Sequence, residues 1–305
     1  MDEPEKKKFI ENYFNKYGSD EIKWLEYKNE RMPDSLFKYK SANNHIYDLI
    51  CDDLLFLEKI ERLNDPYEAQ LFYDIEKIAK EFSFKNRKVV KKELDGGEIE
   101  AEYYKEMDDD GKNELNSIIH EINDKLKNMI SINCLSERND INPLWAHYAD
   151  NHRGICIEYD LKNCGNNFLK TLCFPVNYVE KNDSTEDLIS LIVYKNFDEW
   201  HFLYKSADTK SIDWKYENEW RIVFIENDRN FTDFYSSNKH YATFIEPKSI
   251  YLGLKIDEEV KRRIMDICKF RKINLYRMVK KDYNFILKED VILKFNLEKS
   301  CPVKI

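Results

Sequence analysis

Glycine and proline are unusually scarce in this chain, and their scarcity excludes whole classes of site. The 305 residues include 7 glycines and 7 prolines, whereas average usage of the two together is roughly 12%. Phosphate loops and nucleophile elbows need glycine at fixed offsets, because the backbone must turn sharply or approach a ligand closely. No G-x-G-x-x-G, G-x-x-x-x-G-K-[ST], G-x-S-x-G or H-E-x-x-H motif occurs. The sequence therefore lacks the signatures of Rossmann, P-loop, α/β-hydrolase and zincin sites.

The composition is that of a folded protein with a sizeable core. Hydrophobic residues make up 42% and aromatic residues 14%, with a formal net charge of −9. An acidic chain is not expected to coat nucleic acid or a membrane through a general basic surface, although a local basic groove stays open.

Cysteine usage and the amino terminus indicate where the protein resides. The 7 cysteines form no C-x-x-C pair, so the sequence predicts reduced thiols rather than a disulfide framework. No apolar signal core follows the first charged residues, and no run of about 18 apolar residues occurs. We expect a soluble, cytoplasmic protein without a membrane partner.

The hydrophobic patterning predicts an α+β fold: a mixed or antiparallel sheet of short strands flanked by helices. We expect a helical arm at 1–33 and a single α+β domain at 34–305, with a charged insertion at about 85–113. Strands are predicted at 36–40, 54–57, 130–135, 154–159, 220–225, 242–245, 250–254 and 275–276. Helices are predicted at about 42–51, 114–129, 143–148, 186–204 and 257–270.

Polar residues gather among aromatic ones in four segments, at 37–41, 64–68, 134–158 and 214–221. In the last segment, strand alternation places Glu217, Glu219 and Arg221 on one face. Such a face suits a ribose hydroxyl, a cationic transition state or a phosphate. The alternative is an exposed charge ladder on one side of an antiparallel sheet, which is the commoner arrangement.

The histidines support weaker hypotheses. His147 and His152 are five residues apart, and no carboxylate or cysteine completes a metal set around them, so no metal site is predicted. A His–Cys dyad with Cys134 or Cys156 stays open, as does a structural role for either histidine. The run from Asn64 through Asp65 to Pro66 predicts an Asx turn.

The motifs, in their order along the chain, resemble those of the bacterial "domain of unknown function 2971" family. The resemblance covers roughly residues 36–280. The segments that carry it are Y-K-S (39–41), N-D-P-Y-E (64–68), C-L-S-E (134–137), L-W-A-H-Y-A-D-N-H-R-G-I-C-I-E-Y (144–159) and W-K-Y-E-N-E-W-R (214–221). This resemblance implies that the protein is a component of prokaryotic mobile and antiviral defence loci.

A second, weaker resemblance is to ADP-ribosyltransferase-like folds, which place a glutamate on a late strand to stabilise an oxocarbenium-like transition state. It implies NAD as a substrate, with Glu219 as the central catalytic carboxylate and Glu217 or Arg221 positioning the ligand. Tyr39 and Trp145 would stack on nicotinamide or adenine, and Ser136 would bond ribose. The candidate ligand-binding residues are Tyr39, Lys40, Asn64, Asp65, Ser136, Trp145, His147, Tyr148, His152 and Arg221.

Three functions therefore stay open. One is an NAD-using ADP-ribosyltransferase or NAD glycohydrolase acting on a nucleic-acid or protein target. The second is a metal-dependent nuclease that holds Mg²⁺ through Asp65, Glu68, Glu217 and Glu219. The third is a non-catalytic sensor that binds a nucleotide or a protein partner. The oligomeric state stays open as well.

Overall fold

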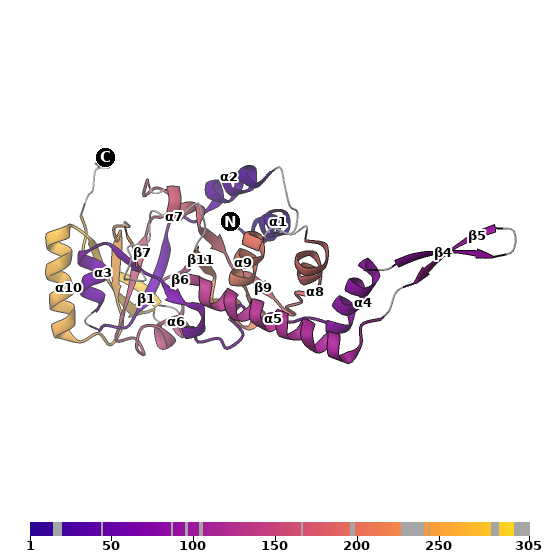
Figure 1. The fold of residues 1–305 in the computed structure, drawn as a ribbon. Coiled ribbons are helices and arrows are strands. Elements are labelled where there is room, and N and C mark those ends of the chain that lie inside the picture. The colour runs from indigo at the N-terminus through magenta and orange to yellow at the C-terminus, as the bar shows by residue number, and fades with distance from the viewer. Residues whose placement is uncertain are drawn as a thin grey trace.

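A mixed β-sheet organises the fold, and helices flank it (Figure 1). The computed structural model describes residues 1–14, 20–43, 45–86, 88–94, 97–103, 106–165, 167–195, 199–226, 241–243, 245–281 and 287–295. The predicted α+β class is confirmed, including the helical region at the amino terminus.

The main sheet has the strand order β15-β14-β13-β7-β1-β6-β11-β8, and β3 pairs with β6 beside this path. Only β13 and β14 pair in parallel; the other pairs in this sheet are antiparallel within the described residues. The strands are β1 (Leu36–Lys40), β3 (Glu58–Lys59), β6 (Ile130–Ser136), β7 (Ile155–Tyr159), β8 (Cys173–Pro175), β11 (Glu219–Ile225), β13 (Ser249–Leu252), β14 (Asn274–Lys280) and β15 (Leu287–Leu293).

Three small sheets complete the strand set. They pair β2 (Leu54–Phe56) with β12 (Tyr241–Thr243), β4 (Lys88–Leu94) with β5 (Gly97–Tyr103), and β9 (Asn177–Val179) with β10 (Thr209–Ser211). The β4–β5 hairpin lies between α4 and α5 (Figure 1), within the predicted charged insertion.

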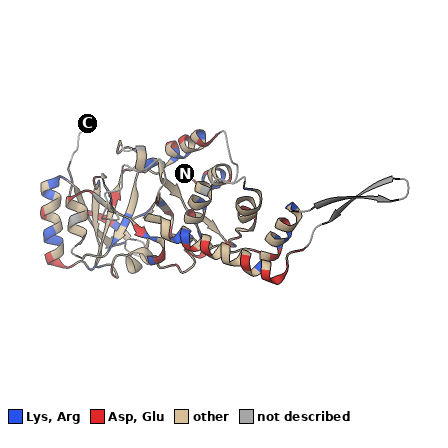
Figure 2. Ribbon diagram, in the orientation of Figure 1, with Lys and Arg blue, Asp and Glu red and all other residues tan. Residues whose placement is uncertain are grey.

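The α-helices are α1 (Glu3–Tyr13), α2 (Glu21–Arg31), α3 (His45–Cys51), α4 (Ile75–Lys85), α5 (Asp109–Met129), α6 (Asn142–His147), α7 (Asn167–Thr171), α8 (Thr185–Leu188), α9 (Glu199–Asp208) and α10 (Glu258–Arg271). Short 3₁₀ turns cover Ile60–Arg62 and Ile212–Glu217. Acidic and basic residues both occur along α5 and α10 (Figure 2). None of the helices in the described part of the chain has the length and apolar character needed to cross a bilayer.

One predicted helix is wrong as a single element. Residues 186–204 were expected to form one aromatic helix, but α8 continues into a π-helix at Ile189–Tyr194, and α9 starts only at Glu199. Lys195 follows the π-helix with φ 53°, in the left-handed region. A residue in the left-handed region ends a right-handed helix. The helix therefore stops at this point although the pattern of apolar residues continues.

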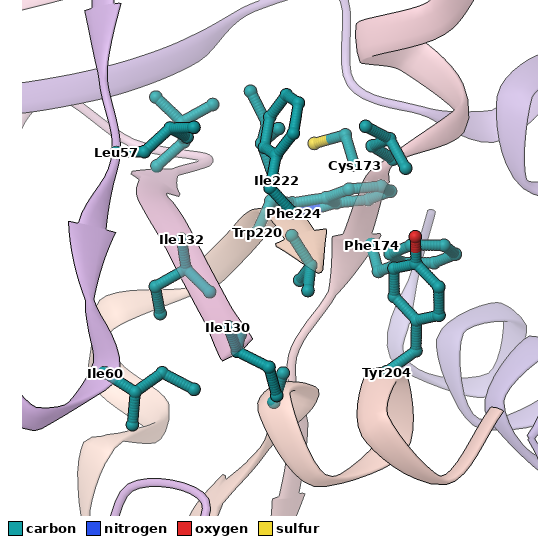
Figure 3. Packing of buried hydrophobic residues seen from close by; sticks show 14 of the residues in the cluster. Leu57, Ile60, Ile130, Ile132, Cys173, Phe174, Tyr204, Trp220, Ile222 and Phe224 are labelled. Atoms are coloured by element: carbon teal, nitrogen blue, oxygen red, sulfur yellow. The ribbon is translucent and has the colours of Figure 1, made fainter. Parts of the chain in front are cut away.

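The main core lies against β6, β8 and β11 (Figure 3). Trp220, Ile222 and Phe224 alternate along β11 and pack near Ile132 of β6 and Phe174 of β8 (Figure 3). The predicted apolar face of this strand is confirmed. Its opposite face carries Glu219 and Arg221, so the packing of the core fixes where these charges lie.

The amino-terminal helices pack into the same core. An Asp2–Glu5 capping box starts α1, whose Phe9 stacks on Phe174 at 6.3 Å between ring centroids. The ammonium of Lys28 on α2 is fully buried and donates to the carbonyl oxygens of residues 170, 171 and 173 at 2.6, 3.2 and 2.8 Å. The helical arm is therefore fastened to the sheet by both apolar and polar contacts.

Candidate functional site

A cavity of about 380 Å³ opens beside the short pairing of β1 with β6. These strands pair at a single register position, Phe37 with Ser136, whereas β1 pairs with β7 at five. All four polar segments contribute to the lining. The residues that line the cavity include Phe37, Lys38, Lys40, Phe56, Glu58, Arg62, Asn64, Glu68, Cys134, Ser136, His147, Tyr148, Lys210, Glu217 and Glu219.

Glu217 is a central carboxyl group of this cavity. Its Oε1 lies 2.9 Å from the hydroxyl of Tyr148, and its Oε2 accepts from Nζ of Lys210 at 2.7 Å. The Tyr148 hydroxyl also lies 3.1 Å from Oδ1 of Asn64. Burial raises the pKa of Glu217, and the opposing attraction of Lys210 does not cancel that effect. A cavity carboxyl group with a raised pKa suits proton transfer near neutral pH.

Glu219 is more completely engaged. Its Oε1 accepts from Nε of Arg221 at 2.9 Å, and its Oε2 accepts from Nζ of Lys210 at 2.9 Å. Burial alone would raise its pKa, but the two adjacent cations lower it well below the ordinary value. Glu219 therefore stays ionised, and both of its oxygens already have partners.

Arg221 is the structural centre of this charge cluster. Its guanidinium makes a bidentate pair with Glu68, at 2.8 and 2.7 Å, and also donates to the carbonyl of Ala207. The side chain is fully buried. The predicted shared face of Glu217, Glu219 and Arg221 exists, but it is buried rather than an exposed ladder. Arg221 has no free donor fork for a phosphate, which does not fit its predicted ligand-binding role.

Lys210 lies where the nuclease hypothesis would place a metal ion. Its Nζ is 2.7 Å from Glu217, 2.9 Å from Glu219 and 3.6 Å from Glu68. The Lys210 ammonium, together with the Arg221 guanidinium that pairs with Glu68 and Glu219, already occupies the space between the three carboxylates, so this donor set does not fit a divalent cation. Asp65 is separate from them, because its Oδ1 accepts from the amide of Tyr67 at 2.9 Å in the predicted Asx turn. No metal-holding group of three His, Cys, Asp or Glu side chains occurs in the described ranges.

Two lysines of β1 form the basic side of the cavity. Nζ of Lys38 donates to the carbonyl of Cys134 at 2.8 Å. The ammonium group of Lys40 has no hydrogen bond or ion pair among the residues that the structure describes. Its Nζ lies 5.5 Å from the ring centroid of Phe56. Burial, and then the charge of Lys38, lower the pKa of Lys40 to about 8.

Three predicted ligand contacts are instead parts of a small aromatic core. Trp145 is fully buried and donates from Nε1 to the carbonyl of Asn139 at 2.7 Å. Tyr39 packs edge-on against it and donates to the carbonyl of Arg138 at 2.8 Å. The ring of His152 stacks on Trp145 at 6.1 Å. The rings of Trp145 and Tyr39 are almost fully buried and leave no face for nicotinamide or adenine, which does not fit their predicted stacking roles.

The other predicted residues divide between positioning and access. The Ser136 hydroxyl donates to the carbonyl of Glu217 at 2.6 Å, so it holds the turn that carries this carboxylate. His147 is exposed and lines the cavity. Burial raises the pKa of both candidate dyad thiols, Cys134 and Cys156, which disfavours the thiolate that a Cys–His dyad requires.

Sequence reasoning missed Lys38 and Lys210. No motif surrounds Lys210, and its partners lie seven or more residues away, so only the folded chain brings them together. Lys38 precedes Lys40 by two residues on a predicted strand, and this spacing could have indicated a shared face.

Comparisons with known proteins agree with the motif resemblance. No curated protein and no solved structure matches the chain, so the resemblance to ADP-ribosyltransferase-like folds has no support from them. Residues 144–222, which include Tyr148, Glu217 and Glu219, match the family described as "Protein of unknown function (DUF2971)". Over this segment the predicted resemblance to the DUF2971 family is thereby confirmed.

Proposed function

We propose that the cavity binds a nucleotide such as NAD and that Glu217 acts as the general base in cleavage of its glycosidic bond. The observation that carries this proposal is the position of Glu217. It is the cavity carboxyl group with a raised pKa, and it touches the hydroxyl of Tyr148. The structure thus favours Glu217 over Glu219, which the sequence had placed at the centre.

The lining of the cavity suits a ligand with two different ends. Lys40 and Arg62 provide cationic groups for a phosphate, while Asn64, Tyr148 and Glu217 can hydrogen-bond the hydroxyls of a sugar. The volume of about 380 Å³ lies within the range of small-molecule sites.

The proposed reaction follows from these positions. As the bond between ribose C1 and the nicotinamide nitrogen breaks, its electron pair leaves with nicotinamide, which needs no proton. The ribose carbon becomes oxocarbenium-like, and the carboxylate of Glu217 stabilises the positive charge on it. Glu217 takes a proton from the attacking water, whose oxygen bonds to C1, giving ADP-ribose. Transfer to a protein or nucleic-acid target is the same step with the acceptor's nucleophile replacing water.

Glu219, Lys210 and Ser136 have positioning roles in this proposal. Lys210 bridges the two glutamates, and Ser136 holds the backbone of Glu217. Fixed neighbours keep a catalytic group in its productive geometry.

A sensor function is the second candidate, and one observation favours it. The acidic groups of the cavity already have partners, as in a preformed binding pocket. In that case NAD or another nucleotide would bind without turnover. A role in antiviral defence rests on the family resemblance alone.

The test measures NAD binding by calorimetry and nicotinamide release by mass spectrometry on the purified chain. We expect both signals, with release increased if a protein or nucleic-acid acceptor is supplied. Binding without release under any addition would support the sensor function. The absence of both would remove NAD as the ligand.

A further inference from the structure

We propose that Lys40 is a nucleophilic amine that forms an imine with an aldehyde, of the hydroxylated kind that sugars present, inside the cavity. The inference is independent of NAD cleavage, because imine formation requires no turnover of NAD. It accounts for a cation that the proposed reaction uses only as a phosphate contact.

The ammonium group of Lys40 has no hydrogen-bond acceptor or ion-pair partner in the described structure. Other buried or half-buried ammonium groups in the described part of the chain are closely held: Lys28 donates to three carbonyls, Lys38 to one, and Lys210 lies between carboxylates. Lys40 lines the same cavity as Lys38, yet it contacts an aromatic ring in place of a hydrogen-bond acceptor in the described structure. An amine without an acceptor is free to meet a ligand.

Burial and a neighbouring cation lower the pKa of Lys40. Lys38 lies two residues away on the same strand, so the two ammonium groups share a face and repel each other. Glu58 of β3 acts in the opposite direction, as does Cys134 of β6, but burial and Lys38 prevail and the pKa of Lys40 falls to about 8. Desolvation and an adjacent cation are the two devices that prepare lysine for Schiff-base chemistry.

Polar side chains also line the cavity, and they indicate an aldehyde that carries hydroxyl groups. Asn64, Tyr148 and Glu217 can hydrogen-bond the hydroxyl groups that accompany the aldehyde carbon of a sugar. A purely apolar aldehyde would present no hydroxyl group to these side chains.

The step is balanced without a redox partner. The neutral amine of Lys40 attacks the carbonyl carbon, a C–N bond forms, and the π electron pair moves to oxygen, which takes a proton. Nitrogen then loses a proton, which gives the carbinolamine. Its hydroxyl takes up a proton and leaves as water while the nitrogen lone pair forms the C=N bond, and the resulting iminium loses its N–H proton. The products are an imine and one water molecule.

The experiment exposes the full chain to D-glyceraldehyde with sodium cyanoborohydride, which reduces imines to stable amines, and maps adducts by peptide mass spectrometry. Lys7 and Lys23, whose side chains are 79% and 70% exposed, serve as internal controls. We expect the first adduct on Lys40, at a rate at least about tenfold above that of the two exposed lysines at pH 7.5, because a pKa lowered to about 8 leaves more of the Lys40 amine neutral at this pH. Equal or slower labelling of Lys40 would overturn the proposal.

A pH series separates reactivity from simple accessibility. The labelling rate of Lys40 should reach half its maximum near pH 8, and the rates at Lys7 and Lys23 are followed in the same samples for comparison. In Lys38→Met the midpoint for Lys40 should move to higher pH, because the repelling charge is removed. A midpoint that follows the exposed lysines in the unaltered chain would also overturn the proposal.

Discussion

At the scale of single residues, the buried charge cluster is the feature that most constrains the site. Arg221 and Lys210 lie among the carboxylates of Glu68, Glu217 and Glu219, and all five side chains are nearly inaccessible. Such clusters are weak evidence for stability, since desolvation offsets much of the attraction. Their value here is geometric, because the fixed cations keep Glu219 ionised, whereas burial raises the pKa of Glu217.

Replacing Arg221 by Met should strongly destabilise the protein. Glu68 and Glu219 would lose their charge partner inside the core, and breaking a buried pair in this way costs about 3–5 kcal/mol. Urea denaturation followed by circular dichroism measures the free energy of unfolding. Arg277→Met is the matched control, because the pair of Arg277 with Asp290 is exposed, and exposed pairs contribute about 0–1 kcal/mol. Equal losses in both variants would contradict the account.

Asp208 should make stability depend on pH. Both of its carboxylate oxygens are buried without a hydrogen-bond partner in the described structure, and burial raises its pKa well above the ordinary value. Because the pKa of Asp208 is higher in the folded than in the unfolded chain, its contribution to the free energy of unfolding is fully present below about pH 4 and is lost as the pH rises. Asp208→Asn removes this titration, so the variant should gain stability relative to the unaltered protein between pH 4 and neutrality. Parallel stability curves across that range would refute this assignment.

At the scale of elements, the close approach of β7 to β1 depends on Gly154. A Cβ atom there would lie 2.2 Å from the carbonyl oxygen of Lys40 and 2.9 Å from Cα of Ala149. Both neighbours are backbone atoms, so the strands themselves would have to separate. This contact gives a structural reason for the glycine within the H-R-G-I-C motif.

Gly154→Ala should therefore cost about 3 kcal/mol, at the upper end of overpacking effects. Gly165→Ala is the control, since its Cβ would meet nothing within 4 Å and only its φ of 73° is unfavourable, which costs about 1–2 kcal/mol. Thermal or urea unfolding of both variants measures the difference. A loss at Gly154 no larger than that at Gly165 would show that β1 and β7 can separate without penalty.

Elements with a clear period were predictable, and elements set by tertiary contacts were not. The strand at 36–40 and the helix at about 257–270 appear as β1 and α10 with nearly the predicted bounds. The single helix at 186–204 failed because a left-handed residue interrupts an apolar pattern that continues through it. The helix α4 was not predicted, although Asp74 caps it by accepting from the amide of Lys77.

At the scale of the whole molecule, one sheet brings three of the four polar segments together, and the pair of Glu68 with Arg221 joins the segment 64–68 to them. β1, β6 and β11 are adjacent in the sheet although they are far apart in the sequence. The hydrophobic patterning predicted the fold class, the motifs predicted the resemblance to the DUF2971 family, and strand alternation predicted that Glu219 and Arg221 share a face. These patterns could not separate Glu217 from Glu219, because the lowered pKa of Glu219 depends on Arg221 and Lys210, whose positions only the folded chain defines.

The most direct test of the account compares nicotinamide release from NAD by the unaltered chain and by Glu217→Gln. This substitution keeps the size of the side chain and its contact with Tyr148 while removing the base. We expect the rate constant to fall about 10²–10⁴-fold, as for loss of a general base, with NAD binding by calorimetry retained and the Glu180→Gln control, outside the cavity, unaffected. Turnover by Glu217→Gln at the unaltered rate, or no turnover by the unaltered chain, would contradict the central claim.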